Sequence, residues 1–239
     1  MHSKKLIVPS IVFGLVVMAP LAFAQDPNPG VLPPHSHSYG MTYAEWSTLW
    51  WRWAESFPVA TNPILDPIGA GCALGQTGPV WFLAGTFGGP ATRTCTVPAG
   101  KAILLPLVNI LNDYPCPDPT FQPGPGQSLE DFLTEGAEFF IDHVTELEAE
   151  VDGVALQDLF DYRATSRLFS FTGDTSLQQI DACITGSPQA GVSDGYWIML
   201  RPLSVGNHTI HFRGKEVFPG PSVFETDVTY NLTVAPRNP

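Results

Sequence analysis

The C-terminal part of the chain alternates apolar and polar residues, and this pattern constrains the fold more than any other feature of the sequence. The alternation runs through three segments, namely 195–203, 208–215 and 224–234. In the last segment Val228 and Tyr230 lie on one face of an extended chain, and Asp227 lies on the other. A period of two residues is typical of antiparallel strands with one buried face. We therefore predict three antiparallel strands in this part of the chain.

Earlier segments predict further strands. The apolar runs 78–87 and 101–110 are short for helices and have the length of buried strands. The residues between these runs, 87–101, predict two turns. Over 146–151 three glutamates alternate with apolar residues, which predicts a strand with a solvated acidic face. The pair Asp152-Gly153 that follows is a type I′ hairpin signal.

A helix rich in tryptophan is predicted before the first strand. Thr42 is a suitable N-cap, Glu45 completes a capping box, and Pro58 favours an end at Phe57. Four of the six tryptophans fall within this helix, namely Trp46, Trp50, Trp51 and Trp53. A second helix is predicted after an N-cap at Ser128.

The tryptophans of the first helix occupy two faces. At about 100° per residue, Trp46, Trp50, Trp53 and Phe57 form one narrow stripe, which predicts a packing face. Trp51 lies about 140° from the first of them, so it is the tryptophan that could contact a ligand. Packing beneath a loop is the alternative for Trp51. Arg52 lies on a third face of the helix.

The N-terminus has the pattern of a secretory signal peptide. Two lysines precede an apolar run, and Ala22-Phe23-Ala24 matches a cleavage site, so we predict a signal peptide at 1–24 and export. We expect a Pro-rich flexible arm at 25–38 and a single domain at 39–239. No segment has the length and apolarity of a membrane span.

Cysteine and charge content fit an exported protein. The chain has four cysteines, and in an oxidising compartment we expect two disulfides. Among three possible connectivities we favour Cys72–Cys95 with Cys116–Cys183. There are 11 Lys and Arg against 23 Asp and Glu, and removal of the signal peptide takes away two of the lysines. Such an acidic chain is a poor match for nucleic acid.

These elements together predict a mainly β (α+β) fold. We expect an antiparallel β-sandwich, either Ig-like or jelly-roll, with two packed helices and two disulfides. The oligomeric state is left open.

Carboxylates and strand-face charges are the candidate functional groups. The candidate carboxylates include Glu45, Glu55, Asp66 and Asp113. Asp66 and Asp113 are placed in loops at the ends of apolar strands, where functional sites often form, although turn capping explains both equally well. His211 and Arg213 face the acidic side of the last strand, as candidates for ligand binding or for surface ion pairs. Because no zinc motif is present and the histidines do not converge, we predict no metal and no cofactor.

Three functional hypotheses remain. The first is an exported, non-catalytic module that binds an extracellular polymer, in particular a glycan, through Trp51, Arg52, His211 and Arg213. The second is an extracytoplasmic polysaccharide hydrolase or lyase that uses Asp66, Asp113, Arg52 or His211. The third is a structural or adhesive envelope protein.

Overall fold

The computed structural model of this chain describes residues 28, 30–220 and 222–236, so the predicted signal peptide lies outside the described residues. The helices are α1 (Tyr43–Glu55) and α2 (Leu129–Ile141), with 3-10 helices η1 (Val59–Thr61), η2 (Leu159–Tyr162) and η3 (Thr175–Gln179). The strands are β1 (Val80–Phe82), β2 (Gly89–Pro98), β3 (Ala102–Tyr114), β4 (Val144–Val151), β5 (Val154–Ala155), β6 (Phe169–Phe171), β7 (Gln189–Leu200), β8 (Gly206–Val217) and β9 (Val223–Ala235). The fold is therefore mainly β with two α-helices, as predicted.

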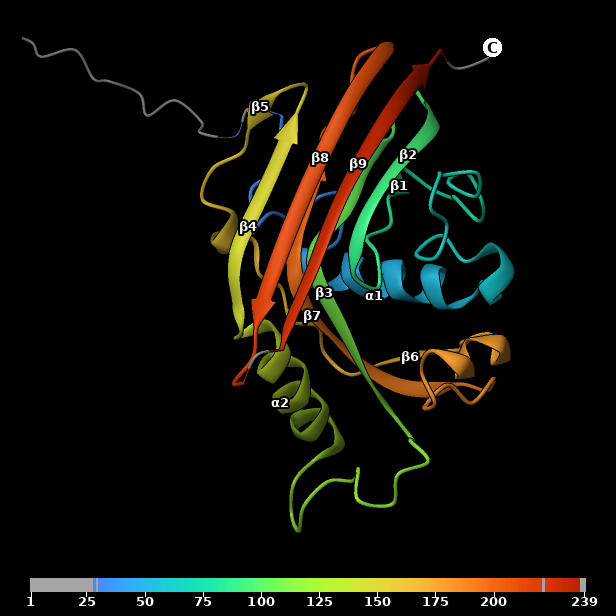
Figure 1. Ribbon diagram of the computed structural model, residues 1–239, viewed down its shortest axis with the longest axis vertical. Coiled ribbons are helices and arrows are strands. Elements are labelled where there is room, and N and C mark those ends of the chain that lie inside the picture. Colours follow the sequence, from blue (N-terminus) through green and yellow to red (C-terminus); the bar gives the residue numbers. More distant parts are fainter. Residues whose placement is uncertain (1–27, 29, 221, 237–239) are drawn as a thin grey trace, which may run out of the picture.

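The strands form two sheets. The four-stranded sheet has the order β1-β3-β7-β6, and the five-stranded sheet has the order β2-β9-β8-β4-β5. Figure 1 shows the five-stranded sheet in front of the long strands β3 and β7, with α2 at one end of the molecule. Apolar side chains from both sheets, including Ile103, Ile198, Phe212 and Val228, belong to one core. The two sheets are thus layers of a single packed unit.

Strand direction differs from the prediction. β1 runs parallel to β3 and β2 runs parallel to β9, whereas the other pairs are antiparallel. An antiparallel Ig-like or jelly-roll sandwich is therefore not confirmed. Alternation shows which residues are buried, but it does not show the direction of the neighbouring strand. In addition, the segment 87–101, for which we predicted two turns, has a turn at 99–100, but most of it, residues 89–98, forms β2.

Local sequence patterns predicted the positions of strands and hairpins more reliably than the directions of the strands. β8 and β9 pair antiparallel with His211 opposite Thr229, close to the predicted bounds. The hairpin predicted at Asp152-Gly153 connects β4 to β5, and both residues have the positive φ angles, 53° and 77°, that a type I′ turn requires. The alternating segments therefore fold as sheet with the expected face buried.

Helix α1 begins as the sequence predicts. The Thr42 side chain accepts a hydrogen bond from Glu45 N, and Glu45 Oε2 accepts one from Thr42 N at 2.8 Å, which completes the capping box. All four tryptophans of α1 are at most 7% exposed. Trp50 packs against Trp51 with ring centroids 4.9 Å apart and planes nearly perpendicular at 88°. The helix is thus buried over most of its circumference, by the sheet and by loops, and not by one stripe alone.

Two disulfides and an N-terminal segment tie peripheral parts to the sheets. The predicted pairs Cys72–Cys95 and Cys116–Cys183 are both present. In the segment predicted to be a flexible arm, Val31 is 2% exposed and forms a β-bridge with Leu200. None of the helices within the described residues is long and apolar enough to cross a membrane.

The two sheets approach each other closely at a glycine. Gly214 on β8 faces β3, and a Cβ at this position would overlap Val108 Cγ2 and lie 2.9 Å from Leu107 O. Glu216, the next residue of β8 on the same inner face, is 5% exposed. The close contact at Gly214 therefore lies directly beside the place where a buried carboxyl faces the space between the sheets.

We expect Gly214→Ala to lower the free energy of unfolding by about 3 kcal/mol, because the added methyl group must separate two packed strands. Gly85→Ala is the matched control, since a Cβ there would meet only Pro106 Cγ at an ordinary 3.7 Å. That control should be neutral or slightly stabilising. Urea unfolding of both variants measures the difference, and equal stabilities would contradict the close contact.

Candidate functional site

The predicted site residues lie in four separate places. Asp66 is a turn residue, and its carboxylate accepts hydrogen bonds from the backbone N–H groups of Ile68, Gly69 and Gly71 at 2.7–3.0 Å. Burial alone would raise its pKa, but these donors hold the pKa of Asp66 below its ordinary value. Asp66 therefore has the properties of a turn cap, the alternative that its sequence context allowed.

His211 and Arg213 lie on the outer face of the five-stranded sheet. His211 Nε2 is 2.9 Å from Asp227 Oδ1, and Arg213 Nε donates to Glu225 Oε1 at 2.6 Å. Arg213 also pairs with Glu146 and Glu148 of β4. The structure thus brings the predicted cluster together and adds the acidic face of β4 to it. The side chains of His211 and Arg213 are both paired with carboxylates of neighbouring strands.

Arg52 leaves α1 on the side of β6. Its guanidinium donates to Ser170 O at 2.8 Å and lies 5.5 Å from the centre of the Phe169 ring. These contacts attach α1 to the edge strand of the four-stranded sheet. Arg52 does not line any of the cavities beside Trp51.

Trp51 lies between two adjoining cavities. The first, of about 200 Å³, is lined mainly by aromatic side chains, and Asn109 and Glu216 are among its polar residues. The second, of about 290 Å³, is lined by Glu55 and Asp181 together with aliphatic residues. Trp51, Phe87 and Ile110 line both. We refer to the two cavities together as the Trp51 crevice. Although Trp51 is only 6% exposed, it lies where a ligand in either cavity would meet it.

Three carboxyl groups from distant parts of the chain converge at the second cavity. Glu55 is the last residue of α1, Asp113 lies near the end of β3, and Asp181 follows η3. Asp113 and Asp181 offer oxygen atoms within 4.8 Å of each other. The Asp174 N–H donates to Glu55 O at 2.8 Å, which fastens the end of α1 to the η3 segment. Packing of η3 against α1 therefore brings the three carboxyls together.

The environment of Glu55 and Asp113 favours their protonated forms. Burial, followed by the charges of Asp181 and Asp113, raises the pKa of Glu55 to about 8. Burial and the charge of Asp181 raise the pKa of Asp113 to about 7, although a hydrogen bond from Gln189 opposes that shift. Glu55 is 7% exposed and has no hydrogen-bond or ion-pair partner for its carboxyl among the described residues. At neutral pH this site therefore holds at least one proton that it can donate.

The same cluster is a poor metal site. The third group beside Asp113 and Asp181 is Cys183, whose sulfur is bonded to Cys116 and is therefore no thiolate ligand. Asp113 already accepts a hydrogen bond from Gln189, and Asp181 Oδ1 accepts one from Cys183 N at 2.9 Å. Calcium requires six to eight oxygen ligands. The arrangement is suited to proton transfer and not to cation coordination.

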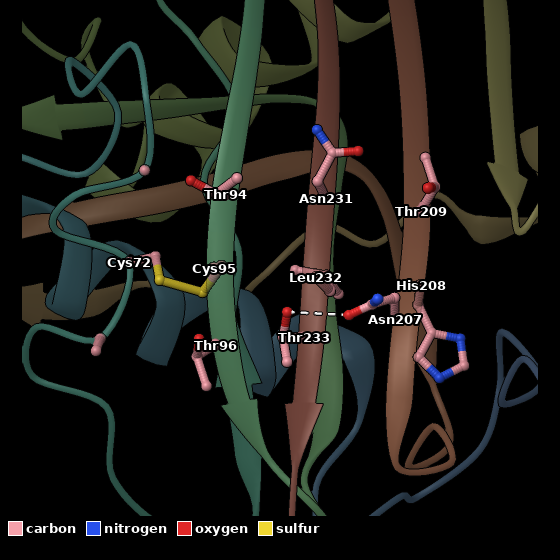
Figure 2. A pocket seen from close by; sticks show the side chains of 12 residues that line it. Cys72, Thr94, Cys95, Thr96, Asn207, His208, Thr209, Asn231, Leu232 and Thr233 are labelled. Carbon is pink, nitrogen blue, oxygen red and sulfur yellow. Dashed lines mark hydrogen bonds between the residues drawn. A yellow bond between two sulfur atoms is a disulfide. The ribbon is translucent and has the colours of Figure 1, made fainter.

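A larger and more open cavity of about 580 Å³ lies on the outer face of β2, β9 and β8. Figure 2 shows two rows of small polar side chains across these strands. The rows follow the strand register and consist of Thr94, Asn231 and Thr209, and of Thr96, Thr233 and Asn207. Thr233 donates to Asn207 Oδ1 at 3.2 Å. This surface offers hydroxyl and amide groups, but it lacks the perturbed carboxyls of the Trp51 crevice.

Sequence reasoning identified Trp51 and Asp113 and named Glu55 among further candidate carboxylates, but it missed Asp181 and Glu216. Asp181 lies in a segment without a recognised motif. Glu216 follows a strand pattern that ended at 215. No spacing between positions 55, 113 and 181 indicates that they meet.

A scan against protein-family models and searches of curated proteins and of solved structures found no match for this chain. The functional assignment therefore depends on the chemistry of the Trp51 crevice.

Proposed function

We propose that the protein is an exported hydrolase that cleaves glycosidic bonds of a polysaccharide in the Trp51 crevice. The observation that carries this proposal is the convergence of Glu55, Asp113 and Asp181 from three separate elements beside a tryptophan-lined cavity. Glycoside hydrolysis requires a pair of carboxyls, one protonated and one ionised. Carboxyls whose surroundings separate their protonation behaviour are the usual basis of such a pair.

The roles follow from exposure and protonation. Glu55 lines the cavity and is protonated at neutral pH, so it acts as general acid and gives its proton to the oxygen that leaves. Asp181 lines the same cavity and accepts a proton from the attacking water. The anomeric carbon exchanges its bond to the leaving oxygen for a bond to the water oxygen. Proton return from Asp181 to Glu55 through solvent restores the starting state.

Asp113 acts as a positioning residue in this proposal. It is 4% exposed and lies beside Asp181, held by the Gln189 amide. Because two adjacent carboxyls do not both ionise readily, Asp113 keeps its proton while Asp181 acts as the base. The Trp51 ring supplies an apolar wall of the kind that stacks on sugar rings.

The test is incubation of the purified protein with a panel of polysaccharides, with released sugar measured by mass spectrometry. Glu55→Gln and Asp181→Asn should each lower the rate by about 100-fold or more, because each removes one proton-transfer step. Asp161→Asn is the control, since Asp161 is an exposed residue of η2 away from the crevice. Its rate should equal that of the wild type.

The outcomes separate the alternatives. Release of sugar that is unaffected in both Glu55→Gln and Asp181→Asn would overturn the assignment of these residues. Release of unsaturated products would indicate a lyase. If no polysaccharide in the panel is cleaved, the hydrolase proposal fails.

Binding without cleavage is the second candidate function, and the polar rows in Figure 2 favour it. Neighbouring strands lie about 4.8 Å apart and alternate residues about 6.8 Å apart, so the rows form a regular grid of hydrogen-bonding groups. A flat polymer with repeating hydroxyls matches such a grid. Retention on an insoluble polysaccharide without release of sugar, lost in Thr94→Val with Thr233→Val, would support this function.

A further inference from the structure

The aromatic cavity beside Trp51 has features that general acid catalysis does not use. Its lining includes six aromatic side chains, namely Trp50, Trp51, Phe87, Phe140, Phe218 and Phe224. The rings of Trp50 and Trp51 are nearly perpendicular, and those of Phe140 and Phe218 are inclined at 76° with centroids 5.7 Å apart. Aromatic rings at such angles, all lining one cavity, form adjoining apolar walls of a box.

One acidic side chain enters this box. Glu216 lies on the inner face of β8, is 5% exposed and lines the cavity. Its carboxyl has no hydrogen-bond or ion-pair partner among the described residues. Its neighbour Lys215 points to the opposite face of the sheet, where it pairs with Glu146 at 2.6 Å. The wall also contains the Asn109 amide, whose Nδ2 is buried without an acceptor in the described part of the chain.

We infer that this cavity binds an organic ammonium ion, with the cation between the aromatic rings and its charge balanced by Glu216. A cation over aromatic faces is attracted to the negative ring faces, and the attraction is strongest where water is excluded. Burial of a carboxylate without a partner lowers the stability of the folded protein, and a bound cation offsets that loss. The lining contains no Lys, Arg or His that would supply the charge from within the described residues.

The ammonium group has two chemical sources, a quaternary amine or the primary amine of an amino sugar. Matched pairs of probes distinguish them. Choline and 3,3-dimethylbutan-1-ol have the same shape and differ in charge. Glucosamine and glucose differ in the same way at one ring position. The unpaired Asn109 donor suits a ligand that carries a hydroxyl beside its cation, as all the charged probes do.

Calorimetric titration at pH 7 tests the inference, because burial raises the pKa of Glu216 to about 7, so a large fraction of the carboxyl is ionised there while the amine of glucosamine is still mainly protonated. In at least one pair the charged member should bind about tenfold or more tightly than its neutral partner. Preference for choline would identify a quaternary amine, and preference for glucosamine would identify an amino sugar. Equal binding within both pairs, or no binding, would overturn the inference.

Two variants locate the site. Glu216→Gln keeps the size of the side chain and should abolish the preference for the charged probe while leaving the affinity for its neutral partner within about twofold. Phe224→Leu should weaken both members of the pair. If the preference survives in Glu216→Gln, the cation binds elsewhere and the inference fails. This result does not depend on hydrolysis, which is measured separately with Glu55→Gln.

Discussion

At pH 8 the Glu55→Gln variant is expected to be more stable than the wild-type protein, by about 2 kcal/mol, although it lacks the proposed general acid. The wild-type site must take up a proton or tolerate a buried charge when the protein folds at this pH. A glutamine has neither requirement, and the cost of its buried amide is smaller, on the order of 1–3 kcal/mol. A side chain that lowers stability while it supports activity is characteristic of a functional site.

The sign of the pH dependence follows from the pKa of Glu55, which is about 8 in the folded protein against an ordinary 4.5. Between these values the unfolded chain has released the proton and the folded protein still holds it. Folding therefore requires proton uptake in this window, and stability falls as the pH rises from about 4.5 to about 8. Asp113 acts in the same direction between 3.8 and about 7. Below the ordinary pKa values of 4.5 and 3.8, both carboxyls are protonated in the folded and in the unfolded state, and the loss of stability disappears.

Urea unfolding at pH 5 and pH 8 measures the effect. The wild type should lose on the order of 3 kcal/mol between these values, since one pKa unit corresponds to about 1.4 kcal/mol. The loss should be distinctly smaller in Glu55→Gln. Asp161→Asn, which removes an exposed carboxyl, should follow the wild type at both pH values. A Glu55→Gln variant that is less stable than the wild type at pH 8 would show that this carboxyl contributes to stability.

Replacement of Arg93 is expected to cause the largest loss of stability, about 3–5 kcal/mol for Arg93→Met. Arg93 is 1% exposed, and its guanidinium donates only to neutral acceptors, none of which is a carboxylate. It donates to the carbonyls of Ile64, Asp66, Ala84 and Gly85 and to the Tyr230 hydroxyl at 2.6–3.0 Å. Removal of the guanidinium leaves these carbonyls buried and without their hydrogen-bond donor.

Arg93→Lys should not restore the lost stability, because a single ammonium group cannot reach acceptors that the planar guanidinium spans. Arg167→Met is the control. The Arg167 side chain is 93% exposed and pairs with Glu130 at 3.1 Å, so its loss should change stability by no more than about 0.5 kcal/mol. Denaturant midpoints of the three variants compare these costs. A wild-type midpoint in Arg93→Lys would mean that the positive charge alone is required, and not the planar geometry of the guanidinium.

The sequence predicted those features that neighbouring residues determine. The capping box of Thr42 and Glu45 and the hairpin at Asp152-Gly153 are local, and both are present in the structure. The burial face of β9 also follows from alternation, since a one-residue change of register would expose its apolar side chains. These signals do not depend on which strand lies beside which.

The features that could not be predicted depend on long-range packing. Arg93 alternates with the outward Thr92 and Thr94 in β2, but the flanking glycines and prolines obscured this strand. Its carbonyl partners come from loops whose paths are set by the tertiary fold. The convergence of Glu55 with Asp113 and Asp181 likewise requires that η3 packs against the end of α1. Asp113 was identified as a loop residue, whereas it is a buried residue of β3.

The position of β9 has a consequence for the order in which the fold is assembled. β9 lies between β2 and β8, although it follows both in the chain. Until residues 223–235 have emerged, β2 has no neighbour in its sheet and Arg93 has no Tyr230 hydroxyl to bind. A chain truncated before residue 223 is therefore expected to stay incompletely folded, because an edge strand of one sheet and a buried guanidinium both lack their partners.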